Sequence, residues 1–292
     1  MDVRAIFMGV VFSLMWSSAF ASAHIIVAAA PPLMALSLRF AVSGLIAVGF
    51  ARSLGQSWRL SPPLVRSVVI FGLCQNALYL GLNFVAMQHI QASLASIIAS
   101  SMPLIVALLG WLWQGEKVRP VGLAGLSAGF VGVAIIMGGR VYGGADPLSI
   151  ALCLVGATAL AIATLTVRSV SSGGNLLMIV GLQMLVGSVV LGVIAAFSET
   201  AQITPSLTLL AAFTYQIFIP GLAATFLWFT LVARVGAVKA STFHFLNPFF
   251  GLIIAALVLG ETIVPLDMVG VAIGAVGILA VQMSRVQAAD TR

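Results

Sequence analysis

Polar side chains that could bind a small solute stand together in a long apolar stretch of the chain. Gln75, Asn76, Tyr79 and Asn83 are spaced by three and four residues, so a helix would place them on one face. Amides and a phenol donate and accept hydrogen bonds without carrying a charge. The pattern therefore predicts either the polar wall of a binding cavity or hydrogen bonds between neighbouring helices.

A second polar group lies beside two prolines within apolar stretches. His244 and Asn247 precede Pro248, and Ser100 precedes Pro103. A proline inside a helix removes a backbone hydrogen bond and bends the helix, and nearby polar side chains can bond the freed carbonyl groups. We expect both prolines to form hinges or shape a cavity wall; a bend that affects only packing is the alternative. His244 could bind solute, carry a proton or bond a neighbour.

Aromatic side chains could supply the apolar surface of such a cavity, although a single aromatic residue in a membrane helix is more often a packing residue or an interface anchor. The aromatic candidates for solute binding are Trp16, Tyr215, Trp228 and Phe243. Arg39 lies within another apolar stretch. It is expected to reach outward or to cap carbonyl groups of a neighbouring helix, and binding of a solute carboxylate is the alternative.

Acidic residues are confined to the ends of the apolar stretches. A pump that exchanges a proton for a cation needs a buried ionisable group, and a site for phosphorylated solutes needs several buried basic residues. The sequence therefore favours a neutral or zwitterionic solute with an apolar body, moved without a dedicated proton-carrying carboxylate. A proton carried by His244 would overturn this expectation. The acids at stretch ends or nearby joints are Glu116, Glu199, Glu261 and Asp267.

Motifs of enzymes and metal sites are missing from the sequence. It contains neither H-E-x-x-H nor G-x-S-x-G, and its two cysteines, Cys74 and Cys153, are too few for a metal site. We therefore expect no enzymatic activity, no cofactor and no bound metal. The expected partners are a small-molecule solute and the lipid bilayer.

The composition is that of an integral membrane protein. Hydrophobic residues make up 61% of the 292 residues and charged residues only 7%, with a mean hydropathy of +1.19, whereas soluble domains carry about 25% charge. Stretches of near-spanning length in such a chain are expected to be helices. Ten are predicted, at residues 5–24, 33–51, 64–86, 92–113, 121–139, 147–167, 176–197, 208–231, 240–259 and 263–284.

Basic residues set the predicted orientation. With the N-terminus inside, 11 of the 13 Lys and Arg residues fall at the chain ends or in the loops on the cytoplasmic side. The positive-inside rule then places both termini in the cytoplasm. The bases are spread over all these joints, so anionic lipid headgroups are their expected partners and nucleic acid is not. They are Arg4, Arg52, Arg59, Arg66, Lys117, Arg119, Arg168, Arg234, Lys239, Arg285 and Arg292.

An internal repeat relates the two halves of the chain at an offset of 145 residues, as in Pro103 with Pro248 and Pro120 with Pro265. Five predicted spans separate equivalent residues, and an odd number inverts one copy relative to the other. The sequence thus predicts two inverted five-helix repeats, residues 1–140 and 145–287, an architecture typical of alternating-access transporters. Further matches are Ala95-Ser96 with Ala240-Ser241, Gly115-Glu116 with Gly260-Glu261, and Gly125, Gly129 and Gly132 with Gly270, Gly274 and Gly277.

Small-residue ladders in the fifth and tenth stretches permit close helix contact. Gly125 and Gly129 form one G-x-x-x-G pattern, and Gly270 and Gly274 form another. The contact could lie within one chain or between two copies. The oligomeric state therefore stays open, and a monomer is compatible with the pattern.

Several of these segments resemble a known transporter family. The run from Trp16 to Phe20 resembles the W-G-s-s-f stretch of the drug/metabolite transporter (DMT) superfamily, with Ser17 in place of the usual glycine. Arg39-Phe40 resembles the R-F pair of the EamA-type members, whose domain is duplicated as the Ala-Ser, Pro and Gly-Glu pattern is here.

By overall similarity the chain most resembles the bacterial aromatic amino acid exporters within this superfamily. The resemblance implies an inner-membrane exporter of amino acids with ten helices around a central cavity. A multidrug or other small-metabolite exporter of the same superfamily is the alternative.

Overall fold

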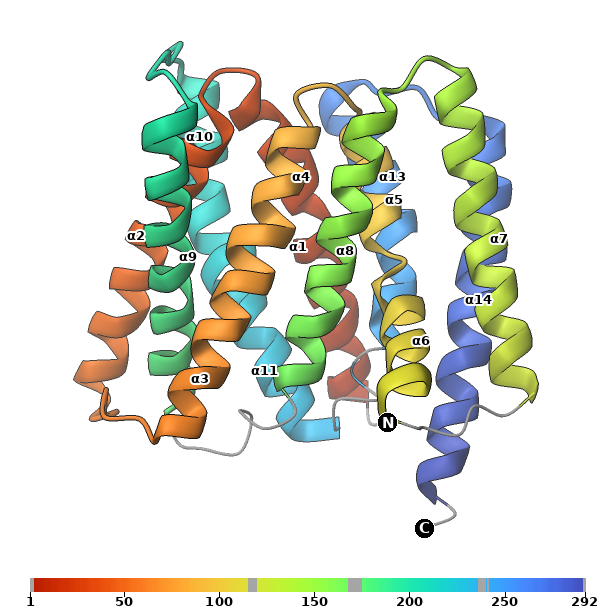
Figure 1. Ribbon diagram of the computed structural model, residues 1–292, viewed down its shortest axis with the longest axis horizontal. Helices are drawn as coiled ribbons and strands as arrows, with labels where there is room; N and C mark the ends of the chain where they lie inside the picture. The colour runs from red at the N-terminus through yellow and green to blue at the C-terminus, as the bar shows by residue number, and fades with distance from the viewer. Residues whose placement is uncertain (1–2, 115–119, 168–174, 236–239, 241, 291–292) are drawn as a thin grey trace.

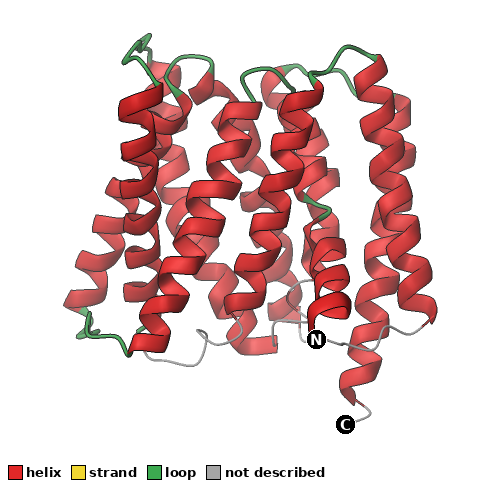
Figure 2. Cartoon of the chain, in the orientation of Figure 1, coloured by secondary structure: helices red, strands yellow, loops and turns green. Residues whose placement is uncertain are grey.

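Helices account for all the regular secondary structure that the computed structural model describes, and no strand occurs in these residues (Figure 2). The described residues are 3–114, 120–167, 175–235, 240 and 242–290. Eight helical segments among them are long and apolar enough to cross a membrane. The all-α membrane class is therefore confirmed. The last two predicted spans correspond to the shorter apolar helices Asn247–Leu259 and Pro265–Ala280.

Uninterrupted helices form six of the ten apolar segments in the described residues. They are α1 (Val3–Val27), α2 (Pro32–Ser53), α7 (Pro120–Tyr142), α8 (Pro147–Val167), α9 (Leu176–Ser198) and α14 (Pro265–Asp290).

Interrupted helices form the other four segments. In two of them a π-helical stretch separates two α-helices: α3 (Pro62–Phe71), η1 (Gly72–Leu80) and α4 (Gly81–Ala86), and α10 (Leu207–Gln216), η2 (Ile217–Ala223) and α11 (Ala224–Val235). A third is broken between α5 (Ala92–Ala99) and α6 (Met102–Gln114), and in the fourth a 3-10 turn, η3 (Thr242–Leu246), precedes α13 (Asn247–Leu259).

These interruptions follow the sequence repeat. The π-helical stretches begin at Gly72 and Ile217, which are 145 residues apart (217 − 72). The helices that follow the breaks begin at Met102 and Asn247, again 145 apart (247 − 102). The packing follows the repeat as well. Two pairs of equivalent helices pack on each other, α7 on α14 and α2 on α9. The contact of α1 with α13 is matched by the contact of α8 with α6.

The two ends of the bundle differ in the loops they carry (Figure 1). The upper end carries loops 28–31, 87–91, 143–146, 199–206 and 260–264, and the start of α1 and the end of α14 lie at the lower end. In each of the pairs α1 with α8, α2 with α9 and α7 with α14, the two helices run in opposite directions between these ends.

The core and the outer surface are both apolar, as expected where lipid replaces water as the solvent. Phe12, Phe40 and Phe84 are almost fully buried, whereas Phe7, Phe197 and other large apolar side chains are exposed. Because lipid does not drive apolar side chains inward, helix contacts in such a protein depend on close packing and on hydrogen bonds.

Glycines bring α7 and α14 into backbone contact within the chain. A Cβ atom placed on Gly132 would lie 2.7 Å from the Gly270 carbonyl oxygen, and one on Gly277 would lie 2.5 Å from the Gly129 nitrogen. Neither backbone atom can move aside as a flexible side chain would. The close helix approach predicted from the glycine ladders is therefore confirmed, and it occurs between the two halves of one chain.

We expect Gly277→Ala to destabilise the protein and Gly274→Ala to leave it unchanged. A methyl group on Gly277 meets the backbone of α7, whereas one on Gly274 meets no atom within 4 Å. Overpacking of this kind costs about 1–3 kcal/mol. Thermal unfolding of the detergent-solubilised protein, followed by tryptophan fluorescence, would measure the difference. Equal unfolding midpoints for the two variants would contradict the packing described here.

Candidate functional site

A cavity opens beside both π-helical stretches. Its walls come from α1, α2, the η1–α4 stretch, α9 and the η2–α11 stretch. The space between the walls amounts to about 530 Å³, including the part open to solvent. This volume is an upper limit on the room for a solute, because it includes space outside the walls.

Five of the predicted solute-binding residues line this cavity: Trp16, Gln75, Asn76, Tyr79 and Asn83. The polar four lie on η1 and α4, where the helix is widened for two turns instead of following a regular α-helical path. π-Helical stretches are rare and occur often at functional sites. The sequence spacing found the correct face of the segment but not its widening.

The four polar residues differ in the hydrogen bonds they make. The Asn76 side-chain nitrogen donates to the backbone oxygen of Gln183 at 2.9 Å and to its side-chain oxygen at 3.2 Å, which ties η1 to α9. The Asn83 side-chain nitrogen donates to the Tyr79 carbonyl oxygen at 2.8 Å. Gln75 is half-buried and has no hydrogen-bond partner among the described residues. Asn76 thus holds helices together, while the Gln75 side chain lines the cavity without a bond to another described residue.

Several buried polar atoms of the cavity lack a partner. They are the Tyr79 hydroxyl, the Asn83 Oδ1 and the Gln216 Oε1. Most buried polar groups in proteins are hydrogen-bonded, so each of these atoms calls for a partner such as water or a polar ligand. Gln216 was missed in the sequence analysis, although an amide in the middle of the apolar stretch 208–231 was a signal of the same kind as Asn76.

Arg39 also lines the cavity and does not reach the protein surface. Its residue is only 4% exposed. Its Nε donates to the carbonyl oxygen of Gln216 at 3.2 Å, which is the carbonyl cap expected from the sequence. The guanidinium carbon lies 5.0 Å from the ring centroid of Phe40. Arg39 therefore places a positive charge inside the cavity wall.

Next to the cavity, His244 belongs to an aromatic cluster. Its ring lies 5.0 Å from Trp228, 5.4 Å from Phe12 and 6.4 Å from Trp16, measured between ring centroids. Its Nδ1 is 2.9 Å from the side-chain nitrogen of Asn247. His244, Trp228 and Asn247 do not line the cavity themselves, and Trp16 is the residue that the cluster and the cavity share.

Three further candidates lie away from the cavity. Phe243 is buried against α1, where its carbonyl oxygen accepts from the Ser13 hydroxyl at 2.8 Å. Tyr215 is 37% exposed, and its hydroxyl lies 2.6 Å from that of Ser18. Ser100 lines a separate apolar crevice with Pro248, and its hydroxyl donates to the Ser96 carbonyl oxygen at 2.7 Å.

The two predicted hinge prolines stand at helix breaks. Pro103 is the second residue of α6, and Pro248 is the second residue of α13. The Ser100 and Ser101 hydroxyls bond carbonyl groups of the preceding helix, as expected for a proline-interrupted segment. The interruptions are short: helical backbone hydrogen bonds continue through the turn at Ser100 and Ser101, and the 3-10 turn η3 leads directly into α13.

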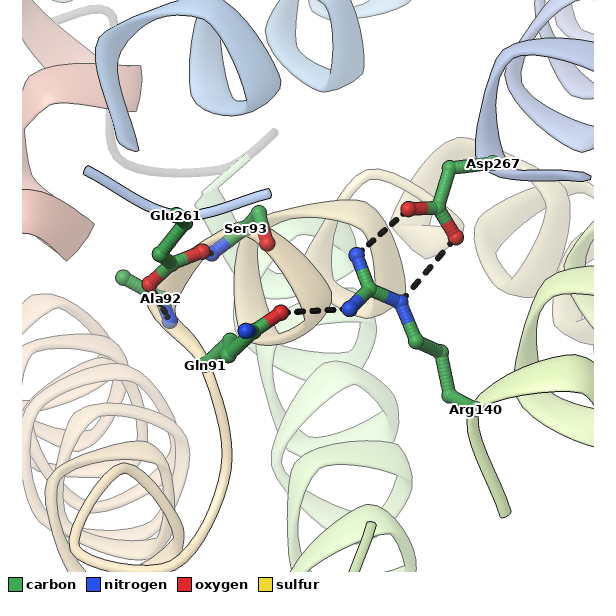
Figure 3. A network of polar contacts seen from close by, with 6 residues as sticks. All are labelled: Gln91, Ala92, Ser93, Arg140, Glu261 and Asp267. Carbon is green, nitrogen blue, oxygen red and sulfur yellow. Dashed lines mark hydrogen bonds and ion pairs between the residues drawn. The ribbon is translucent and has the colours of Figure 1, made fainter. Parts of the chain in front are cut away.

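Acidic side chains bind helix starts at the upper end (Figure 3). The Glu261 carboxylate accepts from the backbone nitrogens of Ala92, at 2.7 Å, and Ser93, at 3.1 Å. Arg140 pairs with Asp267 and also donates to the Gln91 side chain. This upper-end network of Gln91, Ala92, Ser93, Arg140, Glu261 and Asp267 joins α5, α7 and α14.

Glu199 binds the start of α2 in the same way, accepting from the backbone nitrogens of Leu33 and Met34 at 2.8 Å each. In the loop before α8, hydrogen bonds from the Ser149 hydroxyl and backbone lower the pKa of Asp146. The expected position of acids at helix ends is confirmed for Glu199, Glu261 and Asp267. Glu116 lies outside the described residues, as do Lys117, Arg119, Arg168, Lys239 and Arg292.

Replacing Asn76 and Gln75 separately with alanine should separate structural from solute-binding roles. Asn76→Ala removes two bonds to α9 and should cost about 0.6–2 kcal/mol of stability. Gln75→Ala removes no bond, so the unfolding midpoint should stay unchanged while solute flux in liposomes falls. Thermal unfolding and flux measured on the same preparations would test this. A destabilised Gln75→Ala variant beside an unaffected Asn76→Ala variant would contradict the assignment.

Comparisons with known proteins relate the whole chain to transporters. The model of the EamA-like transporter family matches twice, at residues 3–138 and 147–283. The uncharacterized transporter YvbV of Bacillus subtilis is 26% identical over 85% of this chain and 81% of its own length. The uncharacterized inner membrane transporter YedA of Escherichia coli is 25% identical over 87% of this chain and 83% of its own.

One relative carries a named substrate. An S-adenosylmethionine/S-adenosylhomocysteine transporter of Chlamydia trachomatis is 27% identical over 50% of this chain and 43% of its own length. A crystal structure that carries no functional name superposes with a TM-score of 0.71 at 18% identity and covers 97% of this chain and 98% of its own. At this level of identity the likeness is evidence for the fold and not for a function. The two matched halves, the transporter relatives and the helical membrane fold establish that the chain belongs to the EamA-like transporter family.

Proposed function

We propose that this chain exports amino acids, aromatic ones foremost, across the bacterial inner membrane by alternating access. The observation that carries the proposal is the cavity beside the paired π-helical stretches. Its walls combine aromatic residues such as Trp16 and Phe40 with neutral polar residues that keep an unpaired buried atom, among them Tyr79. This combination suits a solute that has an apolar ring and a small polar end.

The proposed architecture is ten membrane spans in two inverted five-helix repeats, residues 1–140 and 145–287. Three features support it: the π-helical stretches that begin 145 residues apart (217 − 72), the opposite directions of paired helices (Figure 1), and the two family matches. The excess of basic residues at the lower end favours a cytoplasmic position for both termini. The upper end then faces the periplasm.

Alternating access would use the interrupted helices as its moving parts. A helix break near the middle of the membrane lets one half move relative to the other, and α6 and α13 begin at such breaks in both repeats. The upper-end network joins α5, α7 and α14 in the present conformation. Opening of this end would separate those helices and break the network.

A cation pump of the same family is less well supported. No Asp or Glu lines the cavity in the described part of the chain, and Glu199, Glu261 and Asp267 are all bonded at the upper end. A buried acid is the group that such a pump would use to exchange a proton for a cation. Export without a proton-carrying carboxylate is therefore the proposed mode.

Counterflow in proteoliposomes tests this function. Vesicles loaded with unlabelled phenylalanine should accumulate external labelled phenylalanine or tryptophan, and a pH gradient should not be required. Vesicles without protein and vesicles with heat-denatured protein are the controls. Folded protein that gives no flux above empty vesicles would refute amino acid transport. Uptake of an organic cation that requires a pH gradient would favour the multidrug alternative.

A further inference from the structure

We propose that Arg39 forms a carboxylate-binding subsite in the cavity, for a solute that carries one carboxylate and an apolar body. This inference deepens the proposed function and rests on the cavity being the transport site. The sequence favours a structural role for Arg39, and its surroundings in the fold point to a ligand as well.

The charge of Arg39 has no acidic partner within the described chain. Arg140, by contrast, is paired with Asp267 at the upper end. A guanidinium offers five N–H donors, and the bond from Nε to Gln216 is the hydrogen bond that Arg39 makes to described residues. Its terminal nitrogens are left available in a residue that is only 4% exposed.

A buried cation without a counter-charge is costly, because neither water nor a protein carboxylate compensates for the lost hydration. The cost falls when an anion enters the cavity. A carboxylate suits a guanidinium especially well, since two parallel N–H···O bonds can form. An organic cation would instead add a like charge beside Arg39.

Gly221 on η2 packs closely beside Arg39. A Cβ atom on it would lie 2.8 Å from the Gln216 carbonyl oxygen, 3.3 Å from the Ser43 hydroxyl oxygen and 3.7 Å from Nη2 of Arg39. The Ser43 hydroxyl, one turn along α2 from Arg39, has no partner. Ser43 is itself fully buried and does not line the cavity, so the guanidinium, and not this hydroxyl, is the donor offered to a carboxylate.

The remaining groups of the cavity suit an amino acid that is anchored at Arg39. The side-chain nitrogen of Gln216 donates to Ala19 and Ser22, which leaves its Oε1 as an unpaired acceptor. The Oδ1 of Asn83 is also unpaired. An α-ammonium group can donate to such amide oxygens, while Phe20 and Phe84 offer surface to an apolar side chain.

Three matched probes separate the carboxylate from the rest of the solute. Phenylalanine carries both charged groups, phenylpyruvate carries the carboxylate without the ammonium, and phenylalaninamide carries the ammonium without the carboxylate. Binding is read from the thermal shift of the purified full-length protein, and transport from counterflow. The variants are Arg39→Gln and Arg39→Lys, with Arg52→Gln as control because Arg52 lies on the same helix and is exposed.

Wild-type protein and Arg52→Gln should bind phenylalanine and phenylpyruvate more tightly than phenylalaninamide. Arg39→Gln should weaken binding of both carboxylates about tenfold to a hundredfold, the range expected for a lost charge-assisted hydrogen bond, and should remove the preference over the amide. Arg39→Lys should keep part of the preference for carboxylates, because lysine retains the positive charge but cannot form the two parallel bonds of a guanidinium.

The outcomes distinguish this subsite from the proposed function. Phenylalanine transport that Arg39→Gln leaves unchanged would refute the subsite and keep the function. Binding of phenylpyruvate that depends on Arg39, without any binding or transport of phenylalanine, would keep the subsite and refute amino acid export. If the variants fail to fold, the wild-type protein alone still tests the subsite. An equal thermal shift with phenylalanine and phenylalaninamide, or no shift with either phenylalanine or phenylpyruvate, would overturn it.

Discussion

The need to satisfy every backbone polar group without water governs this structure. An unpaired backbone N–H or C=O in lipid costs several kcal/mol, so a membrane helix can break only where other groups meet the freed donors and acceptors. The breaks in this protein obey that rule. Serine hydroxyls bond carbonyl groups before α6, Arg39 bonds the carbonyl of Gln216 where η2 begins, and the Glu261 carboxylate binds the nitrogens at the start of α5.

The same rule connects the breaks to the cavity. Widened or broken backbone is tolerated where it faces protein or a polar space, and both π-helical stretches line the cavity. They begin at equivalent positions of the sequence repeat, 145 residues apart (217 − 72). By contrast, α7 and α14 are unbroken and packed through glycines, which makes them a rigid contact between the repeats. The interrupted helices are the parts of the fold that can change without breaking this contact.

The sequence predicted the membrane class and, in the described residues, most segment bounds to within a few residues, because the apolar stretches are long and their joints are short. It also predicted that Gln75, Asn76, Tyr79 and Asn83 share one face. It did not predict which residues meet one cavity, since that depends on packing between segments far apart in the chain. Trp16 lines the cavity and Trp228 does not, although both are single aromatic residues in apolar stretches. The widening of η1 was also missed, because no residue type specifies a π-helix.

A spin-label distance across the upper end is the most direct test of alternating access. Labels at Gln88 and Tyr142, both exposed, would report the separation of α5 from α7 by pulsed electron spin resonance, with Cys74 and Cys153 replaced by alanine. Alternating access predicts a second, longer distance when the upper-end network breaks, and a change in the population of that distance when phenylalanine is added. A single distance that phenylalanine does not alter, in protein active in counterflow, would contradict it.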